Sequence, residues 1–230
     1  MARAWEVLDR RETADGLLEL RRRAADDFLI CVGGRVLMNS RASRSELELG
    51  VWTCEGLAER GDGAPPPRVL VAGLGMGLTL RAVLDVLPAA SEVVVAELHP
   101  VVAEWCRGPL AALTDGAVSD ARVRVHLGDV AACIAAAAAG EVAPFEAIVL
   151  DLFEGPHAKT DARGDPLYGT DAIDRCFRAL APGGALGVWG EVRDPGFESR
   201  LARRGFGVET RRPGRGGLRH AIVRARRPAS

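Results

Sequence analysis

Three glycines stand at alternate positions, Gly73, Gly75 and Gly77, between the apolar run 69–72 and the apolar, helix-compatible segment 78–87. This order predicts a strand, a tight turn and a helix. Such a turn lets backbone N–H groups approach a ligand closely at the N-terminus of a helix. The spacing of the glycines does not fit the pattern of dinucleotide-binding turns.

An acidic residue, Glu97, follows twenty positions after Gly77, at the end of a second apolar run, 93–96. A carboxylate in that place can accept hydrogen bonds from both hydroxyls of a ribose. The alternative is a solvated residue near a helix start. Together the glycines and Glu97 predict binding of a small molecule that contains a nucleoside.

Further acids follow two more apolar runs. Asp129 suits an exocyclic amine such as that of adenine, with Val130 beside the ring, although aspartate is also a common helix N-cap. Asp151 and Glu154 can take a proton from, or orient, an amine or hydroxyl. A cofactor contact for Asp151 and a solvated loop position for Glu154 are the alternatives.

Weaker candidates lie elsewhere in the chain. His157 could act as a base in the loop that holds Glu154, or be a bystander. Acids of the predicted helix 46–58 could bind an acceptor amine, but usually form a solvated face: Glu46, Glu48 and Glu55. Tryptophans 52, 105 and 189 are expected in the core or in a cavity wall, and arginines 211, 212 and 215 in a solvated turn or at an anionic substrate.

Alternating strands and helices must position these residues. Strands are expected at 68–72, 92–96, 122–127, 146–150 and 185–189, and helices at 77–87, 99–113, 129–138 and 170–180. This alternation predicts an α/β fold with a parallel sheet and helices on both faces. Ligands of such sheets lie outside the carboxyl ends of the strands, where the glycines and acids would meet.

The flanking segments predict smaller units. A β-hairpin is expected at 28–38 around Gly33 and Gly34, because two glycines supply the positive φ of a two-residue turn. After 185–189 we expect a helix at 195–204 and strands at 207–210 and 220–224, linked by 211–217. The chain divides into an N-terminal hairpin and lead-in helix, 1–60, a stiff proline-rich linker, and a nucleoside-binding domain, 68–230.

Composition limits the remaining possibilities. The 230 residues carry a net charge of −1, which argues against a nucleic-acid or membrane-surface partner, and no apolar run reaches the length of a membrane span. The five cysteines form no C-x-x-C pair, which favours reduced thiols in a cytoplasm and no metal. We expect a cytoplasmic protein with a small-molecule acceptor and with room for a homodimer.

Several motifs together resemble a known family. Val-Ala-Gly-Leu-Gly-Met-Gly, Val-Ala-Glu-Leu-His-Pro, Leu-Gly-Asp-Val and Leu-Ala-Pro-Gly-Gly look like class I S-adenosylmethionine-dependent transferases. Within that group, residues 28 to 192 resemble the spermidine synthase (polyamine aminopropyltransferase) branch. The resemblance implies a Rossmann-like, mostly parallel seven-stranded sheet whose last two strands form an antiparallel hairpin, preceded by a small N-terminal hairpin region.

The resemblance also implies roles for individual residues. It makes Asp151 and Glu154 catalytic, and assigns the acceptor substrate to Glu55, Glu154, His157 and Tyr168. It assigns the donor, S-adenosylmethionine or its decarboxylated form, to Gly73, Gly75, Met76, Gly77, Glu97, Leu98, Asp129, Val130 and Asp151.

Departures from the branch bear on the choice of donor. Met76 stands where aminopropyltransferases carry an aspartate that can pair with the bare ammonium of the decarboxylated donor. The chain also has a single tyrosine, Tyr168. A neutral loop suits the carboxylate of intact S-adenosylmethionine better. The sequence therefore favours methyl transfer to a small, polar, amine-containing acceptor. Aminopropyl transfer to a polyamine and a non-catalytic nucleoside-binding partner are the alternatives.

Overall fold

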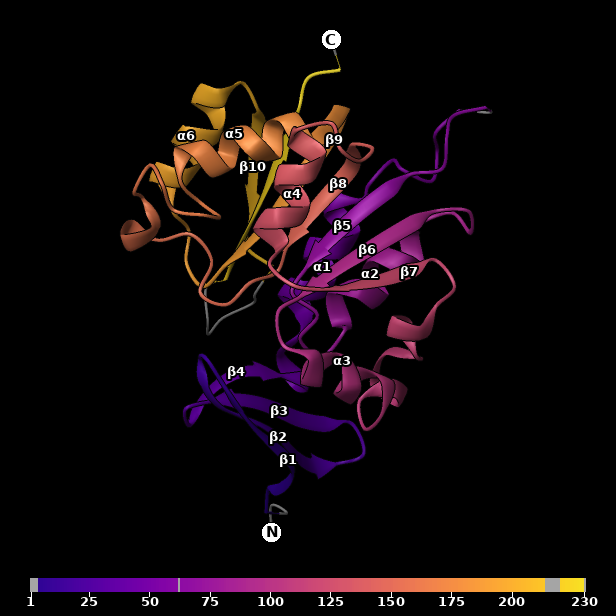
Figure 1. Cartoon of the computed structure of the whole chain (residues 1–230), viewed down its shortest axis with the longest axis vertical. Helices are drawn as coiled ribbons and strands as arrows, with labels where there is room; N and C mark the ends of the chain where they lie inside the picture. Colours follow the sequence, from indigo (N-terminus) through magenta and orange to yellow (C-terminus); the bar gives the residue numbers. More distant parts are fainter. Residues whose placement is uncertain (1–3, 62, 214–219, 230) are drawn as a thin grey trace.

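A small antiparallel sheet begins the chain. The computed structural model describes residues 4–61, 63–213 and 220–229. The sheet joins β1 (Glu6–Thr13), β2 (Gly16–Ala24), β3 (Asp27–Val32) and β4 (Arg35–Asn39) in sequence order, and lies at one end of the molecule (Figure 1). The predicted hairpin corresponds to β3 and β4, with φ of 52° at Gly33 and 83° at Gly34. The β1–β2 hairpin was not predicted, because charged residues dominate β1 and hide its alternation.

A seven-stranded sheet forms the rest of the framework, in the order β10-β11-β9-β8-β5-β6-β7. Strands β9, β8, β5, β6 and β7 run parallel to one another, whereas β11 is antiparallel to both β9 and β10. The predicted α/β class and the C-terminal antiparallel hairpin are therefore confirmed. The strands are β5 (Arg68–Ala72), β6 (Glu92–Glu97), β7 (Val123–Leu127), β8 (Phe145–Leu150), β9 (Leu180–Gly190), β10 (Gly207–Arg211) and β11 (Ala221–Arg226).

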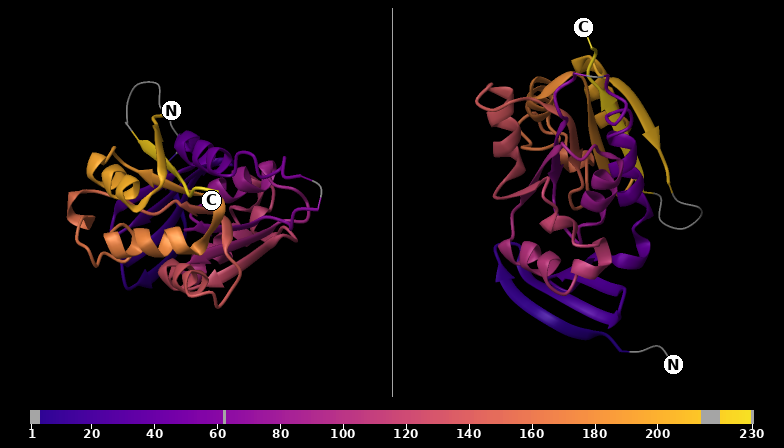
Figure 2. Two further views of the ribbon diagram at one scale, coloured as in Figure 1. Left: turned by 90° about the horizontal axis from the view of Figure 1, so that it is seen from above. Right: turned by 90° about the vertical axis from the view of Figure 1, so that its right-hand side faces the viewer.

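Helices cover both faces of this sheet (Figure 2). Strand residues alternate between the faces: Val69 and Val71 pack with α1–α3, whereas Leu70 and Ala72 pack with α4–α6. The α-helices are α1 (Arg44–Thr53), α2 (Leu78–Val86), α3 (Pro100–Arg107), α4 (Val130–Ala138), α5 (Thr170–Ala179) and α6 (Pro195–Arg204). Short 3₁₀ turns occur at η1 (Ser40–Ala42), η2 (Ala111–Thr114), η3 (Ala117–Ser119) and η4 (Ala158–Thr160).

Several boundaries differ from expectation. The expected helix 99–113 ends at Arg107, because the chain turns at Gly108 and continues as η2. Strand β9 begins at Leu180, where the Pro-Gly-Gly sequence forms an irregular start with a register shift against β8 instead of a loop. The predicted link 211–217 lies partly outside the described residues. None of the described helices is long and apolar enough to cross a membrane.

Candidate active site

A cavity of about 440 Å³ separates the two sheets. Its floor comes from the carboxyl ends of β5, β6, β8 and β9 and from the residues that follow β7. Its roof is apolar and comes from the small sheet: Leu18, Ile30, Val32, Val36, Leu37 and Met38. The cavity therefore opens at the place where open parallel sheets bind ligands.

Glycine is required in the first turn by close packing. Gly73 has φ +79°, and a Cβ there would lie 2.6 Å from the backbone oxygen of Asp151. Gly75 has φ +50°, and its Cβ would lie 2.3 Å from Sδ of Met38 in the roof. Both glycines line the cavity, whereas Gly77, at φ +80°, serves as the N-cap of α2 and does not.

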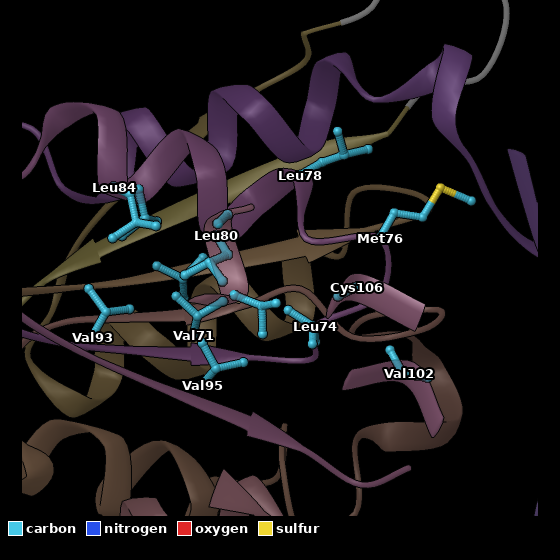
Figure 3. Close-up of a cluster of buried hydrophobic side chains, with 14 of the residues drawn as sticks. Val71, Leu74, Met76, Leu78, Leu80, Leu84, Val93, Val95, Val102 and Cys106 are labelled. Carbon is cyan, nitrogen blue, oxygen red and sulfur yellow. The ribbon is translucent and has the colours of Figure 1, made fainter. Parts of the chain in front are cut away.

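Met76 does not line the cavity. Its side chain is fully buried in the hydrophobic core, in the cluster that contains Leu74, Leu78, Val102 and Cys106 (Figure 3). The residue turns inward because left-handed glycines flank it on both sides. Met76 contributes apolar packing, so its side chain is no guide to the charge that the donor presents in the cavity.

Glu97 lies at the end of β6 with its carboxylate held in place. Oε2 accepts a hydrogen bond from the N–H of Leu74 at 2.9 Å, and Oε1 accepts one from the N–H of His99 at 2.8 Å. The residue is buried, 6% exposed, and lines the cavity. Each carboxylate oxygen can accept a further hydrogen bond, as two ribose hydroxyls would require.

Asp129, Val130 and Leu98 also line the cavity. Oδ1 of Asp129 caps α4 by accepting the N–H of Ala131 at 2.8 Å. Asp129 is therefore the N-cap of α4, as the alternative interpretation expected. This role leaves Oδ2 without a hydrogen-bond partner in the described part of the chain, so capping and ligand binding are compatible.

Asp151 is the acid most affected by its surroundings. The hydroxyl of Thr79 donates to its Oδ2, and both Asp151 and Glu46 line the cavity. Burial, reinforced by the negative charge of Glu46, raises the pKa of Asp151 to about 7, although the Thr79 hydrogen bond acts against the shift. At neutral pH this carboxyl can therefore either hold or accept a proton.

Glu154 lies beside the cavity and not in its lining. Arg35 of the small sheet pairs with it at 2.7 Å and with Glu191 at 3.2 Å, and His157 approaches it at 3.4 Å. The hydrogen bond from Arg35 lowers the pKa of the Glu154 carboxyl. Glu154 has φ +67°, a conformation rare for a residue with a side chain. Its neighbours Phe153 and Glu191 do line the cavity.

Two expected substrate residues lie elsewhere. Glu55 does not line the cavity, because its carboxylate is bound by Arg224 on β11. Tyr168 is buried against Phe197, with ring centroids 5.8 Å apart and an edge-on geometry. Burial raises the pKa of its hydroxyl, and this hydroxyl has no hydrogen-bond partner among the described residues. Neither residue lines the cavity.

The lining has a consistent charge. Six acids face the cavity and, among the described residues that line it, there is no lysine or arginine: the acids are Asp15, Glu46, Glu97, Asp129, Asp151 and Glu191. Sequence reasoning mentioned Glu46 but preferred Glu55. It gave no role to Asp15, which lies in the β1–β2 turn and contacts His99 Nε2 at 2.9 Å.

Comparisons with known proteins agree on the fold. No model of a known protein family matches the chain. Over 142 residues, 60% of the chain, it is 35% identical to a polyamine aminopropyltransferase of Nitrosomonas europaea, and this match spans only 39% of that protein. A solved structure of spermidine synthase from Thermotoga maritima superimposes with a TM-score of 0.71 and 17% identity, covering 97% of this chain and 74% of that one.

A second solved structure, of human methyltransferase-like protein 13 in complex with SAH, gives a TM-score of 0.56 and 24% identity over 81% of each chain. Together these likenesses confirm the fold that the motifs predicted. The chain has the spermidine synthase fold within the class I S-adenosylmethionine-dependent transferase architecture, and the small N-terminal sheet is part of the match.

Proposed function

We propose that this protein transfers a group from an S-adenosylmethionine-type donor to a cationic amine. The observation that supports it most is the charge of the cavity, six carboxylates with no lysine or arginine among the described lining residues. Carboxylates that converge in a partly buried site favour positively charged occupants. A sulfonium donor and an amine acceptor are both cationic.

The donor fits the half of the cavity beneath the glycine turn. Glu97 would accept the ribose hydroxyls, Asp129 and Val130 would lie at the base, and Gly73 and Gly75 would allow the chain to approach closely. The bound donor supplies an electrophilic carbon next to its sulfonium. The protein has to orient the acceptor, exclude water and keep the attacking amine neutral.

Asp151 is suited to the acceptor amine. An amine attacks only with a free lone pair, so the site must remove a proton that the amine carries in water. A carboxyl whose pKa lies at about 7 can take that proton near neutral pH. Glu154, held by Arg35 outside the lining, would bind a more distant part of the acceptor or guide its entry.

Aminopropyl transfer is the form of the reaction that we favour. Asp151 and Glu46 offer partners for a bare ammonium, although the glycine turn itself carries no aspartate. The names of the Nitrosomonas and Thermotoga relatives point the same way. Methyl transfer is the second candidate, because no acidic side chain projects from the glycine turn and the human neighbour was solved with SAH.

The test uses the whole chain with both donors. Intact S-adenosylmethionine, its decarboxylated form and 5′-methylthioadenosine are titrated by calorimetry, and each donor is then incubated with di- and polyamines for mass spectrometry. We expect aminopropyl-bearing amines from the decarboxylated donor. Methylated amines from the intact donor would establish the second candidate. Nucleoside binding without any product would leave a non-catalytic partner protein.

Two variants distinguish the roles of Asp151 and Glu154. Asp151→Asn should reduce turnover by about a hundredfold or more, the usual contribution of a general base. Glu154→Gln should mainly raise KM for the amine, because its carboxylate lies beside the cavity. A cytoplasmic location is part of this proposal and rests on the five free cysteines.

A further inference from the structure

A line of hydrogen bonds leads out of the cavity behind Glu46. The hydroxyl of Ser45 donates to Oε2 of Glu46 at 2.7 Å and lies 3.1 Å from Nδ1 of His220. Nε1 of Trp189 donates to the same hydroxyl at 3.1 Å. Glu46 is buried and lines the cavity, whereas His220 is half-buried and directly precedes β11.

The number of hydrogens available decides which way these bonds run. A serine hydroxyl has one hydrogen and two lone pairs, and an indole N–H can only donate. When the Ser45 hydroxyl donates to Glu46, its two lone pairs accept hydrogen bonds from Trp189 and His220. His220 must then carry a hydrogen on Nδ1. When Glu46 is protonated and donates to Ser45, the hydroxyl can turn to His220, whose Nδ1 must then be bare.

The proton on Glu46 and the tautomer of His220 are therefore linked through Ser45. We propose that Glu46, Ser45 and His220 form a proton relay that carries the acceptor's proton from the cavity to the half-buried His220 directly before β11. The inference rests on the proposed function, because a cationic amine must lose one proton before its lone pair can attack the donor. Asp151 and Glu46 line the same cavity, and the charge of Glu46 contributes to the raised pKa of Asp151.

The transfer balances without any further reactant. An N–H bond of the acceptor ammonium breaks and an O–H bond forms on Glu46. His220 then gives its Nδ1 hydrogen to water and takes one from water on Nε2, which leaves Nδ1 bare. The hydrogen of Glu46 passes to Oγ of Ser45 while the hydrogen of Ser45 passes to Nδ1 of His220. The imidazolium releases its Nε2 hydrogen to water, and the hydroxyl turns back to Glu46. No electrons are exchanged, and Trp189 keeps its hydrogen throughout and fixes the position of the Ser45 hydroxyl.

A purely structural role would be to satisfy the buried groups of Ser45, Glu46 and Trp189. The two roles differ in an observable way. The relay requires that the tautomer of His220 respond to Ser45 and that the loss of either residue slow the release of a proton. Structural satisfaction alone predicts the response of the tautomer but not the slower release of a proton, so the turnover measurement separates the two roles. The tautomer can be measured without donor or acceptor, so it is independent of whether the proposed transfer is found.

The first measurement is nitrogen NMR of labelled histidine in the full chain, in mildly alkaline buffer. His220 should carry its hydrogen on Nδ1 in the wild type and in the control His126→Gln, whose histidine lies on β7. In Ser45→Ala it should shift to the Nε2–H tautomer that free histidine prefers. An Nε2–H tautomer in the wild type, or no response to Ser45→Ala in a folded protein, would overturn the relay.

The second measurement is turnover with the donor and amine identified above. Ser45→Ala and His220→Asn should lower kcat by about tenfold or more, leave KM nearly unchanged and enlarge the solvent deuterium isotope effect. Trp189→Phe should have a smaller effect, because it removes the fixing hydrogen bond and keeps the ring. An unchanged kcat in Ser45→Ala and His220→Asn would refute the relay and leave the proposed transfer intact, whereas inactivity of the wild type would count against the transfer.

Discussion

The carboxylate of Glu97 is fixed by two backbone N–H groups before any ligand arrives. Glu97→Ala should therefore weaken the binding of 5′-methylthioadenosine by more than about tenfold, or about 1.4 kcal/mol, the expected contribution of hydrogen bonds to a charged group. Calorimetry measures the dissociation constant. Glu104→Ala, at an exposed position of α3, is the matched control. An unchanged dissociation constant in folded Glu97→Ala would remove Glu97 from the donor site.

The raised pKa of Asp151 has a consequence for stability. Its ordinary value is 3.8 and its value in the fold is about 7, so the folded chain binds more protons than the unfolded chain between these limits. The free energy of unfolding should then fall as pH rises from about 4 to 7, by a few kcal/mol at most. The contribution of this group is fully present below pH 4 and is lost above pH 7.

Asp151→Asn removes that titration and can still accept the hydrogen of Thr79. The variant should match the wild type near pH 4 and exceed it in stability above pH 7. Urea unfolding at several pH values measures the difference. A constant offset between the two proteins across the range would mean that Asp151 titrates normally.

Two candidate residues, Glu55 and Met76, lie away from the cavity lining for reasons that spacing in the sequence does not reveal. Glu46 lies in the first turn of α1 and lines the cavity, whereas Glu55 lies beyond the end of that helix at Thr53, in a turn where Arg224 binds its carboxylate. Met76 occupies a position of the glycine motif, but between two left-handed glycines its side chain is buried in the core. Spacing located the loop and the strand ends, but it could not supply these orientations.

The glycine turn after β5 should tolerate substitution poorly for two separable reasons. Gly73 and Gly116 both have positive φ, near +79° and +64°, but only Gly73 has a neighbouring backbone atom within reach of a Cβ. Gly116→Ala should cost about 1–2 kcal/mol, the usual penalty of the left-handed conformation. Gly73→Ala should cost distinctly more and also weaken nucleoside binding, because β5 and Asp151 must separate.

Thermal or urea unfolding of the two alanine variants measures their losses in stability, and the difference between them isolates the contact between residue 73 and the Asp151 backbone. Equal losses would show that conformation alone explains the choice of glycine at position 73.

Among the elements, strands and helices of the parallel sheet were predictable because their apolar runs are strong. The β1–β2 hairpin was not predictable, since β1 is largely charged and has no fully buried residue.

The two sheets are joined across the cavity mouth by Arg35, which pairs with Glu154 and Glu191 and lies over the ring of Phe153 at 4.5 Å. A cationic acceptor that approaches these acids has to compete with this guanidinium. Arg35→Gln should therefore bind spermidine, used as a probe, several-fold more tightly at low salt. The gain should shrink as salt rises, because these groups are partly exposed.

Calorimetry at two ionic strengths measures this effect. Arg22→Gln is the matched control, since Arg22 pairs with Glu6 at the other edge of the small sheet. Weaker binding of spermidine by Arg35→Gln would show instead that Arg35 holds the acids in their binding positions.

The division of the cavity between two sheets also affects how the chain is made. The roof residues, 18–38, leave the ribosome before the β5–β9 floor exists. Until then the apolar face of the small sheet, including Leu18, Leu20 and Phe28, has no surface to cover it. We therefore expect this segment to depend on chaperones during synthesis, and a ribosome pause placed before β8 to increase aggregation of the nascent chain.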